Sequence, residues 1–205
     1  MVEGFIGSDV AGGRMSGKEG GVVAARFRLL GQVAVDGADG PIEIGGATAR
    51  AVLAALLLRA DAGASADDLI AMVWGGDGGA TRDSVYHYIS ALRRVLAAAG
   101  VELQTRRPRY RLVVASELVD WYSFRQLVTQ ARAAREKGLG DRAVPGLRTA
   151  LKLWQGEPLA DIGERLSTYR RDMSQNGSPR LSCWPRSKPA RVTTLRWLPC
   201  CGIKS

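Results

Sequence analysis

The sequence has few of the residues from which most enzyme and metal sites are built. Its only histidine is His87, and its three cysteines, Cys183, Cys200 and Cys201, all lie near the C-terminus. The cysteine spacing does not match a zinc site, and adjacent cysteines rarely bind one metal together. His87 has no second histidine with which to bind a metal and no evident Ser or Cys partner for nucleophilic catalysis. We therefore expect neither an enzyme nor a bound cofactor or metal.

Long apolar runs are also missing. No stretch of 18 apolar residues occurs, and the N-terminus lacks a basic segment followed by an apolar one. These absences predict neither a membrane span nor a secretory signal, so we expect a cytoplasmic protein. Gly12, Gly17 and Lys18 match G-x-x-x-x-G-K, but Glu19 stands where a phosphate-binding loop needs Ser or Thr. Residues 1–25 are glycine-rich and lack periodicity, which predicts a disordered leader.

Acidic residues are absent from the last 30 positions. Residues 1–175 contain 23 Lys and Arg against 20 Asp and Glu, whereas residues 176–205 contain six basic residues and no acid. All three cysteines and four of the eight prolines also lie in 176–205. Most of the net charge of +9 therefore comes from a segment unlike the rest of the chain.

The residues from Arg26 onward show an orderly pattern. Strand-like residues with a break at Gly31 precede a turn and a short returning strand at 41–44. A helix is expected over 47–60 with Thr48 as its N-cap, and another over 65–75, where Ser65 and Asp68 form a capping box. A third helix is expected over 81–96, and two short strands over 101–114 enclose a basic turn. This order of a short sheet, three helices and a basic hairpin describes a winged helix-turn-helix.

The third helix has an apolar stripe and a polar outer face. Helical spacing places Val85, Ile89, Leu92 and Leu96 on one side, so that Asp83, His87, Ser90 and Arg94 lie opposite and Arg93 lies on a flank. Taken alone, such a face is typical of solvated helices. The hairpin adds four arginines in six residues: Arg106, Arg107, Arg109 and Arg111.

An arginine-rich hairpin can also be a solvated edge strand whose charges block aggregation. A basic hairpin directly after a helix with an outward His87 and Arg94 favours contact with double-stranded DNA, because guanidinium groups pair with phosphates and with guanine. The alternative is a protein-interaction scaffold whose winged helix does not bind DNA. We expect Arg106, Arg107 and Arg109 to contact mainly phosphates.

A second helical region is expected over 118–175. Phe124, Leu127, Val128 and Ala131 follow helical spacing, Gly138 and Gly140 interrupt the helix, and Asp141 is placed to cap the next. A second apolar stripe then comprises Leu147, Ala150, Leu151 and Trp154. Two such helices, with small residues at their packing positions, resemble one tetratricopeptide unit. A single unit of this kind normally needs neighbouring units to complete its core. The expected fold class is thus mainly α with small β-sheets, followed by an all-α region.

Several segments together resemble a known family: "RFRLLGQVAV", "LIAMVWG", "SVYHYISALRRVL", "YRLVV" and "LKLWQGEPLADI". They are similar to the SARP family of antibiotic regulatory proteins, which joins an OmpR-like winged helix to a bacterial transcriptional activation domain. The resemblance implies a DNA-binding domain over 26–115, a partial activation domain over 118–175, and a pathway-specific activator of secondary-metabolite genes. It also implies a bacterial, nucleoid-associated protein that has RNA polymerase as a partner and self-associates on repeated operators. The implied DNA contacts are, on the helix, Arg82, His87, Ser90, Arg93 and Arg94, and, in the wing, Thr105 and Arg107.

Residues 176–205 do not continue the family pattern. One interpretation is a disordered basic tail that binds nucleic acid. The other is a change of reading frame near Asn176, because back-translation with GC-rich codons gives a helical, alanine-rich string in another frame. Under the second interpretation the activation domain is truncated, and the product binds DNA weakly and does not activate transcription.

Overall fold

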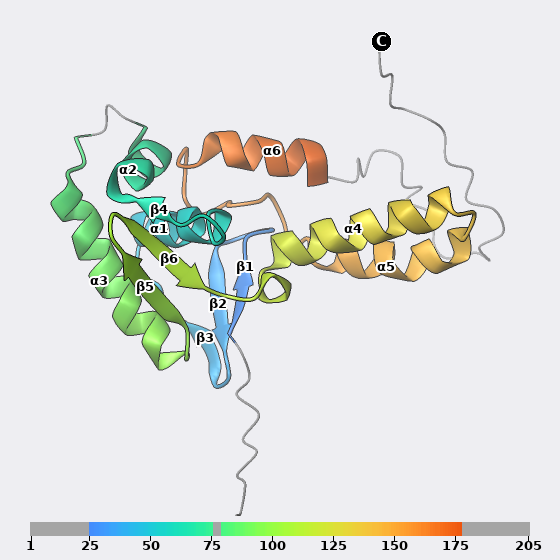
Figure 1. Cartoon of the computed structure of the whole chain (residues 1–205), viewed down its shortest axis with the longest axis horizontal. Helices are drawn as coiled ribbons and strands as arrows, with labels where there is room; N and C mark the ends of the chain where they lie inside the picture. The colour runs from blue at the N-terminus through green and yellow to red at the C-terminus, as the bar shows by residue number, and fades with distance from the viewer. Residues whose placement is uncertain (1–24, 76–78, 178–205) are drawn as a thin grey trace, which may run out of the picture.

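The computed structural model describes residues 25–75 and 79–177, and its elements are arranged as in Figure 1. The leader expected over 1–25 and the tail expected over 176–205 lie almost entirely outside these residues, as does the possible change of reading frame. The described part combines helices with two small antiparallel sheets, and it has the winged-helix arrangement expected from the sequence.

The two sheets have three strands each. The first has the order β1-β2-β3, formed by Arg26–Arg28, Ala34–Gly37 and Gly40–Ile42. The second has the order β4-β6-β5, formed by Ala64–Ser65, Arg109–Val113 and Glu102–Arg106. Strands β5 and β6 form the wing, a hairpin in which Thr105 pairs with Tyr110. The break expected at Gly31 and the basic turn are both confirmed.

Three helices follow the first sheet in the chain, with β4 between the first two: α1 (Ala47–Leu58), α2 (Ala66–Trp74) and α3 (Arg82–Ala98). The capping box of Ser65 and Asp68 is confirmed by hydrogen bonds in both directions. Thr81 and Ser84 form a second capping box at the start of α3. The expectation of Thr48 as the N-cap of α1 is wrong, because the helix begins at Ala47 and its N-cap is Gly46, two residues before Thr48, without a side-chain cap.

A short 3-10 helix, Ser116–Leu118, leads into α4 (Asp120–Glu136), and α5 (Gly140–Lys152) follows. These two helices pack side by side and extend away from both sheets (Figure 1). Phe124, Ala131 and Ala150 are buried, which agrees with the expected stripes. The expected cap at Asp141 is wrong: this residue lies in the first turn of α5, and the N-cap position is Leu139.

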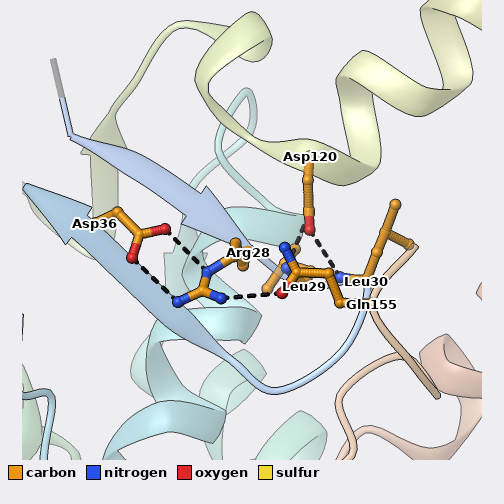
Figure 2. Close-up of polar contacts among 6 residues, drawn as sticks. All are labelled: Arg28, Leu29, Leu30, Asp36, Asp120 and Gln155. Carbon is orange, nitrogen blue, oxygen red and sulfur yellow. Dashed lines mark hydrogen bonds and ion pairs between the residues drawn. The ribbon is translucent and has the colours of Figure 1, made fainter. Parts of the chain in front are cut away.

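The end of β1 is joined to the start of α4 by a carboxylate. The Leu29 amide donates to Asp120 Oδ1 at 2.8 Å, and the Leu30 amide donates to Asp120 Oδ2 at 2.9 Å (Figure 2). Burial raises the pKa of Asp120 to about 6, although the backbone donors favour its charged form. Beside this contact, the Arg28 guanidinium lies between Asp36 and Gln155 (Figure 2).

The segment after α5 returns to the loop between β1 and β2. The Gln155 amide donates to the Leu30 carbonyl at 2.8 Å, and the Leu159 amide donates to the Leu29 carbonyl at 3.1 Å. The Asp161 carboxylate accepts from the Val33 amide at 2.9 Å and pairs with Arg50 at 2.6 Å. We call these contacts, together with those of Asp120, the joint.

Helix α6, Ser167–Gly177, ends the described chain and lies beside α1 in the view of Figure 1. Leu159, Ile162, Leu166 and Met173 from this last part are buried in the same apolar core as Leu53, Leu56 and Leu57 of α1. The joint and the shared core therefore unite the winged helix with the helical region. Among the described residues, no helix is long and apolar enough to cross a membrane.

Candidate nucleic-acid interface

Helix α3 carries two polar stripes. Val85, Ile89, Leu92 and Leu96 are buried as predicted and fix the side of the helix that faces the core. At roughly 100° per residue, His87, Ser90 and Arg94 lie nearly opposite this side, whereas Arg82, Tyr86 and Arg93 lie next to it. We call the first three residues the outer stripe and the second three the inner stripe. All six are exposed.

The inner stripe is occupied by contacts within the protein. Arg82 donates from Nε and Nη2 to the Asp67 carboxylate of α2 at 3.0 and 2.7 Å. These hydrogen bonds lower the pKa of Asp67 and raise that of Arg82. The ring of Tyr86 lies edge-on to Tyr110 of β6, with centroids 6.5 Å apart.

Arg93 connects α3 with the outer strand of the wing. Its Nη2 donates to Thr105 Oγ1 at 2.7 Å, and its Nε donates to the Leu103 carbonyl at 3.2 Å. The sequence predicted both Arg93 and Thr105 as DNA contacts, and the structure brings these two side chains together. Each side chain thus has a partner within the protein.

The outer stripe has fewer such contacts. The His87 ring touches the Tyr88 ring edge-on, with centroids 5.6 Å apart. Arg94 makes no hydrogen bond or ion pair with any other described residue. Its five N–H donors are therefore available on the side of α3 farthest from the core.

In the basic turn of the wing, as on α3, some arginines have partners within the protein and one has none among the described residues. Arg106 donates to Gln104 at 3.2 Å, whereas Arg107 at the tip makes no hydrogen bond or ion pair within the described part of the chain. Arg109 donates to the Gly63 carbonyl at 3.0 Å and lies 3.5 Å from the Asp68 carboxylate. Asp68 has a lowered pKa, chiefly because it accepts hydrogen bonds from Ser65.

Gly63 allows the base of the wing to approach β4 closely. Its φ of +67° lies in the left-handed region, and an added Cβ would lie 2.9 Å from the Tyr110 carbonyl oxygen. A side chain here would clash with backbone, so the position requires glycine. The approach places Arg109 where it can reach the Gly63 carbonyl.

Two residues of this interface, Tyr86 and Asp67, were not identified from the sequence, because their partners are 24 and 15 residues away along the chain.

The described residues contain no cluster of His, Cys, Asp and Glu that could hold a metal ion. What the interface offers is a helix face and a wing tip with unpaired guanidinium groups, a combination suited to a polyanion that has hydrogen-bonding base edges.

Sequence comparisons identify both parts of the chain. Residues 43–112 match the family described as transcriptional regulatory protein, C terminal, and residues 119–183 match the bacterial transcriptional activator domain. The chain belongs to the SARP family. The two matched domains lie in the order that the sequence predicted, and the family comprises transcriptional regulators rather than enzymes.

Two curated relatives illustrate this membership. The transcriptional regulatory protein MoaR1 of Mycobacterium bovis is 32% identical over 145 residues, which cover 68% of this chain and 47% of MoaR1. The transcriptional regulator RedD of Streptomyces coelicolor is 32% identical over 148 residues, which cover 67% of this chain and 41% of RedD. This SARP chain thus spans less than half the length of each.

A solved structure supports the fold. Mycobacterium tuberculosis EmbR in complex with a low-affinity phosphopeptide aligns with a TM-score of 0.69 and 27% sequence identity. The alignment covers 75% of this chain and 42% of the EmbR chain, so it extends across most of the described residues of this SARP protein.

Proposed function

We propose that this chain is a sequence-specific DNA-binding regulator of transcription. The observation that carries the proposal is the outer stripe of α3: His87, Ser90 and Arg94 lie opposite the buried side, and Arg94 has no partner among the described residues. In helix-turn-helix proteins the corresponding helix lies in the major groove. Arginine suits this position because its planar fork pairs with O6 and N7 of guanine.

The wing supplies the complementary contact. Arg107 stands at its tip without a partner in the described chain, and Arg106 is exposed beside it. Charges on a short turn meet the phosphate backbone more readily than they form bidentate pairs with bases. The Arg109 guanidinium already contacts the Gly63 carbonyl and the Asp68 carboxylate, so we propose that it contributes less to phosphate binding.

The helical region is proposed to recruit RNA polymerase and to support self-association on repeated operators. The match of residues 119–183 to an activator domain supports this role. Because the chain belongs to the SARP family, we propose that the genes it activates are those of a secondary-metabolite pathway. The antiparallel pair of α4 and α5 supports a tetratricopeptide-like surface for protein rather than DNA.

The test begins with selection of duplexes from a randomised pool by the full chain. Affinity for a selected duplex and for a scrambled one is then measured across a series of salt concentrations. A DNA-binding regulator binds the selected duplex more tightly and loses affinity steeply as salt rises, because bound counterions are released. If no duplex is enriched and no salt-dependent binding occurs, the chain is instead a protein-interaction scaffold with a winged helix that does not bind DNA.

A further inference from the structure

Strand β5 is one of the two edge strands of its sheet within the described residues, since the order is β4-β6-β5. Strand β6 is held on both sides, by β5 and by β4. Helix α3 packs against β5: Arg93 of α3 donates to the Leu103 carbonyl, and the Leu103 side chain is buried in the core. The position of β5, and with it one arm of the wing tip, therefore depends on contacts made by α3.

Arg93 makes two of these contacts with one planar group. Its Nε binds the Leu103 carbonyl and its Nη2 binds Thr105 Oγ1, the residue directly before Arg106. A guanidinium that binds two acceptors two residues apart fixes both the distance and the angle between helix and strand. A lysine ammonium has the same charge but is a single point on a flexible stem, so it cannot do this.

We propose that Arg93 and Thr105 are positioning residues, which set the wing tip relative to the outer stripe so that Arg94 and Arg107 contact one duplex together. This inference rests on the proposed DNA-binding function. It assigns Arg93 a role through the wing instead of a direct contact with a base or a phosphate. The other inner-stripe contacts, Arg82 with Asp67 and Tyr86 with Tyr110, support the same side of α3.

The decisive variant is Thr105→Val, which removes the hydroxyl acceptor without changing charge or size. With a duplex selected by the wild-type chain, we expect affinity to fall five- to tenfold and the slope of log affinity against log salt to decrease by about one, because a phosphate contact of the wing is lost. Thr105→Ser keeps the hydroxyl and restores both values. Thr129→Val, the same change at an exposed position of α4, is the matched control and leaves both unchanged.

Arg93→Lys separates positioning from direct contact. If Arg93 positions the wing, Arg93→Lys loses as much affinity as Thr105→Val, and the double variant loses no more than either single one. If Arg93 binds a phosphate directly, lysine preserves most of the affinity and Thr105→Val has no effect, which overturns the proposal.

A measurement without DNA keeps the inference separate from the proposed function. Amide hydrogen exchange over residues 103–106 is expected to quicken in Thr105→Val and in Arg93→Lys, and to return to the wild-type rate in Thr105→Ser. Exchange that is unchanged in the first two variants overturns the inference even if wild-type protein binds DNA. Failure of the wild-type chain to bind any duplex, with exchange altered as expected, refutes only the proposed function.

Discussion

The two sheets of this protein are alike in size and strand direction, but they face different neighbours. In the first, β1-β2-β3, the loop between β1 and β2 takes part in the joint. There the main-chain amides of Leu29 and Leu30 donate to Asp120, and that of Val33 donates to Asp161. The second, β4-β6-β5, ends in a wing tip whose Arg107 has no partner among the described residues. Changes in the first sheet should therefore alter stability, and changes at the tip of the second should alter DNA binding.

The largest effect is expected at Asp120. Asp120→Ala leaves the Leu29 and Leu30 amides without their acceptor in a partly buried place, and we expect the free energy of unfolding to fall by about 3 kcal/mol. Chemical denaturation measures this loss. DNA affinity should stay unchanged under conditions where the variant is folded. The control is Asp141→Ala at the exposed first turn of α5, which should cost less than about 1 kcal/mol.

The pH dependence of stability gives a second test at the same residue. Because the pKa of Asp120 is raised from 3.8 to about 6, the folded state binds more protons than the unfolded state between these values. This group therefore lowers stability as pH rises from about 4 to about 6, by up to about 3 kcal/mol. The measurement is the unfolding free energy of wild type minus that of Asp120→Asn at several pH values. A difference that stays constant from pH 4 to pH 7 would contradict the prediction.

Arg94→Ala should act on DNA and not on stability. Loss of a base contact is expected to weaken binding to a selected duplex by about 1–3 kcal/mol and to relax the preference at one position. Competition binding with single-base variants of the duplex measures both effects. Arg132→Ala removes the same charge from the exposed side of α4 and serves as control. The assignment fails if affinity and site preference remain unchanged in Arg94→Ala.

The smallest effect is expected at Arg107. Arg107→Ala should weaken binding to selected and scrambled duplexes alike and reduce the salt slope by about one, the value for a single lost phosphate contact. Fluorescence anisotropy across a salt series gives the slope. A changed sequence preference with the slope preserved would show instead that the wing tip contacts bases.

Local signals in the sequence were sufficient for most of the winged helix. The capping box of Ser65 and Asp68 and the buried stripe through Val85 and Leu92 depend on spacings of three or four residues, which a sequence shows directly. Thr48 failed as an N-cap because the choice between neighbouring start positions depends on the backbone and not on the capping residue alone.

The joint and the inner stripe required the structure. Asp120 and Leu29 are 91 residues apart, and nothing in either local sequence indicates the other. Arg82 and Arg93 are the same residue type as Arg94, and the family resemblance implied DNA contact for all three. Only the structure shows that two of these guanidinium groups are hydrogen-bonded within the protein: Arg82 donates to Asp67, and Arg93 donates to Thr105.

The joint also bears on the order of events during synthesis. Val33 and Asp161 are 128 positions apart, so the loop between β1 and β2 leaves the ribosome long before its partner exists. At about 5–20 residues per second, the interval is about 6 to 25 s. During this time the Val33 amide lacks its native acceptor, and the Leu29 and Leu30 amides lack theirs until Asp120 has been made. We therefore expect the nascent N-terminal sheet to be the part of this chain most exposed to chaperones and proteases.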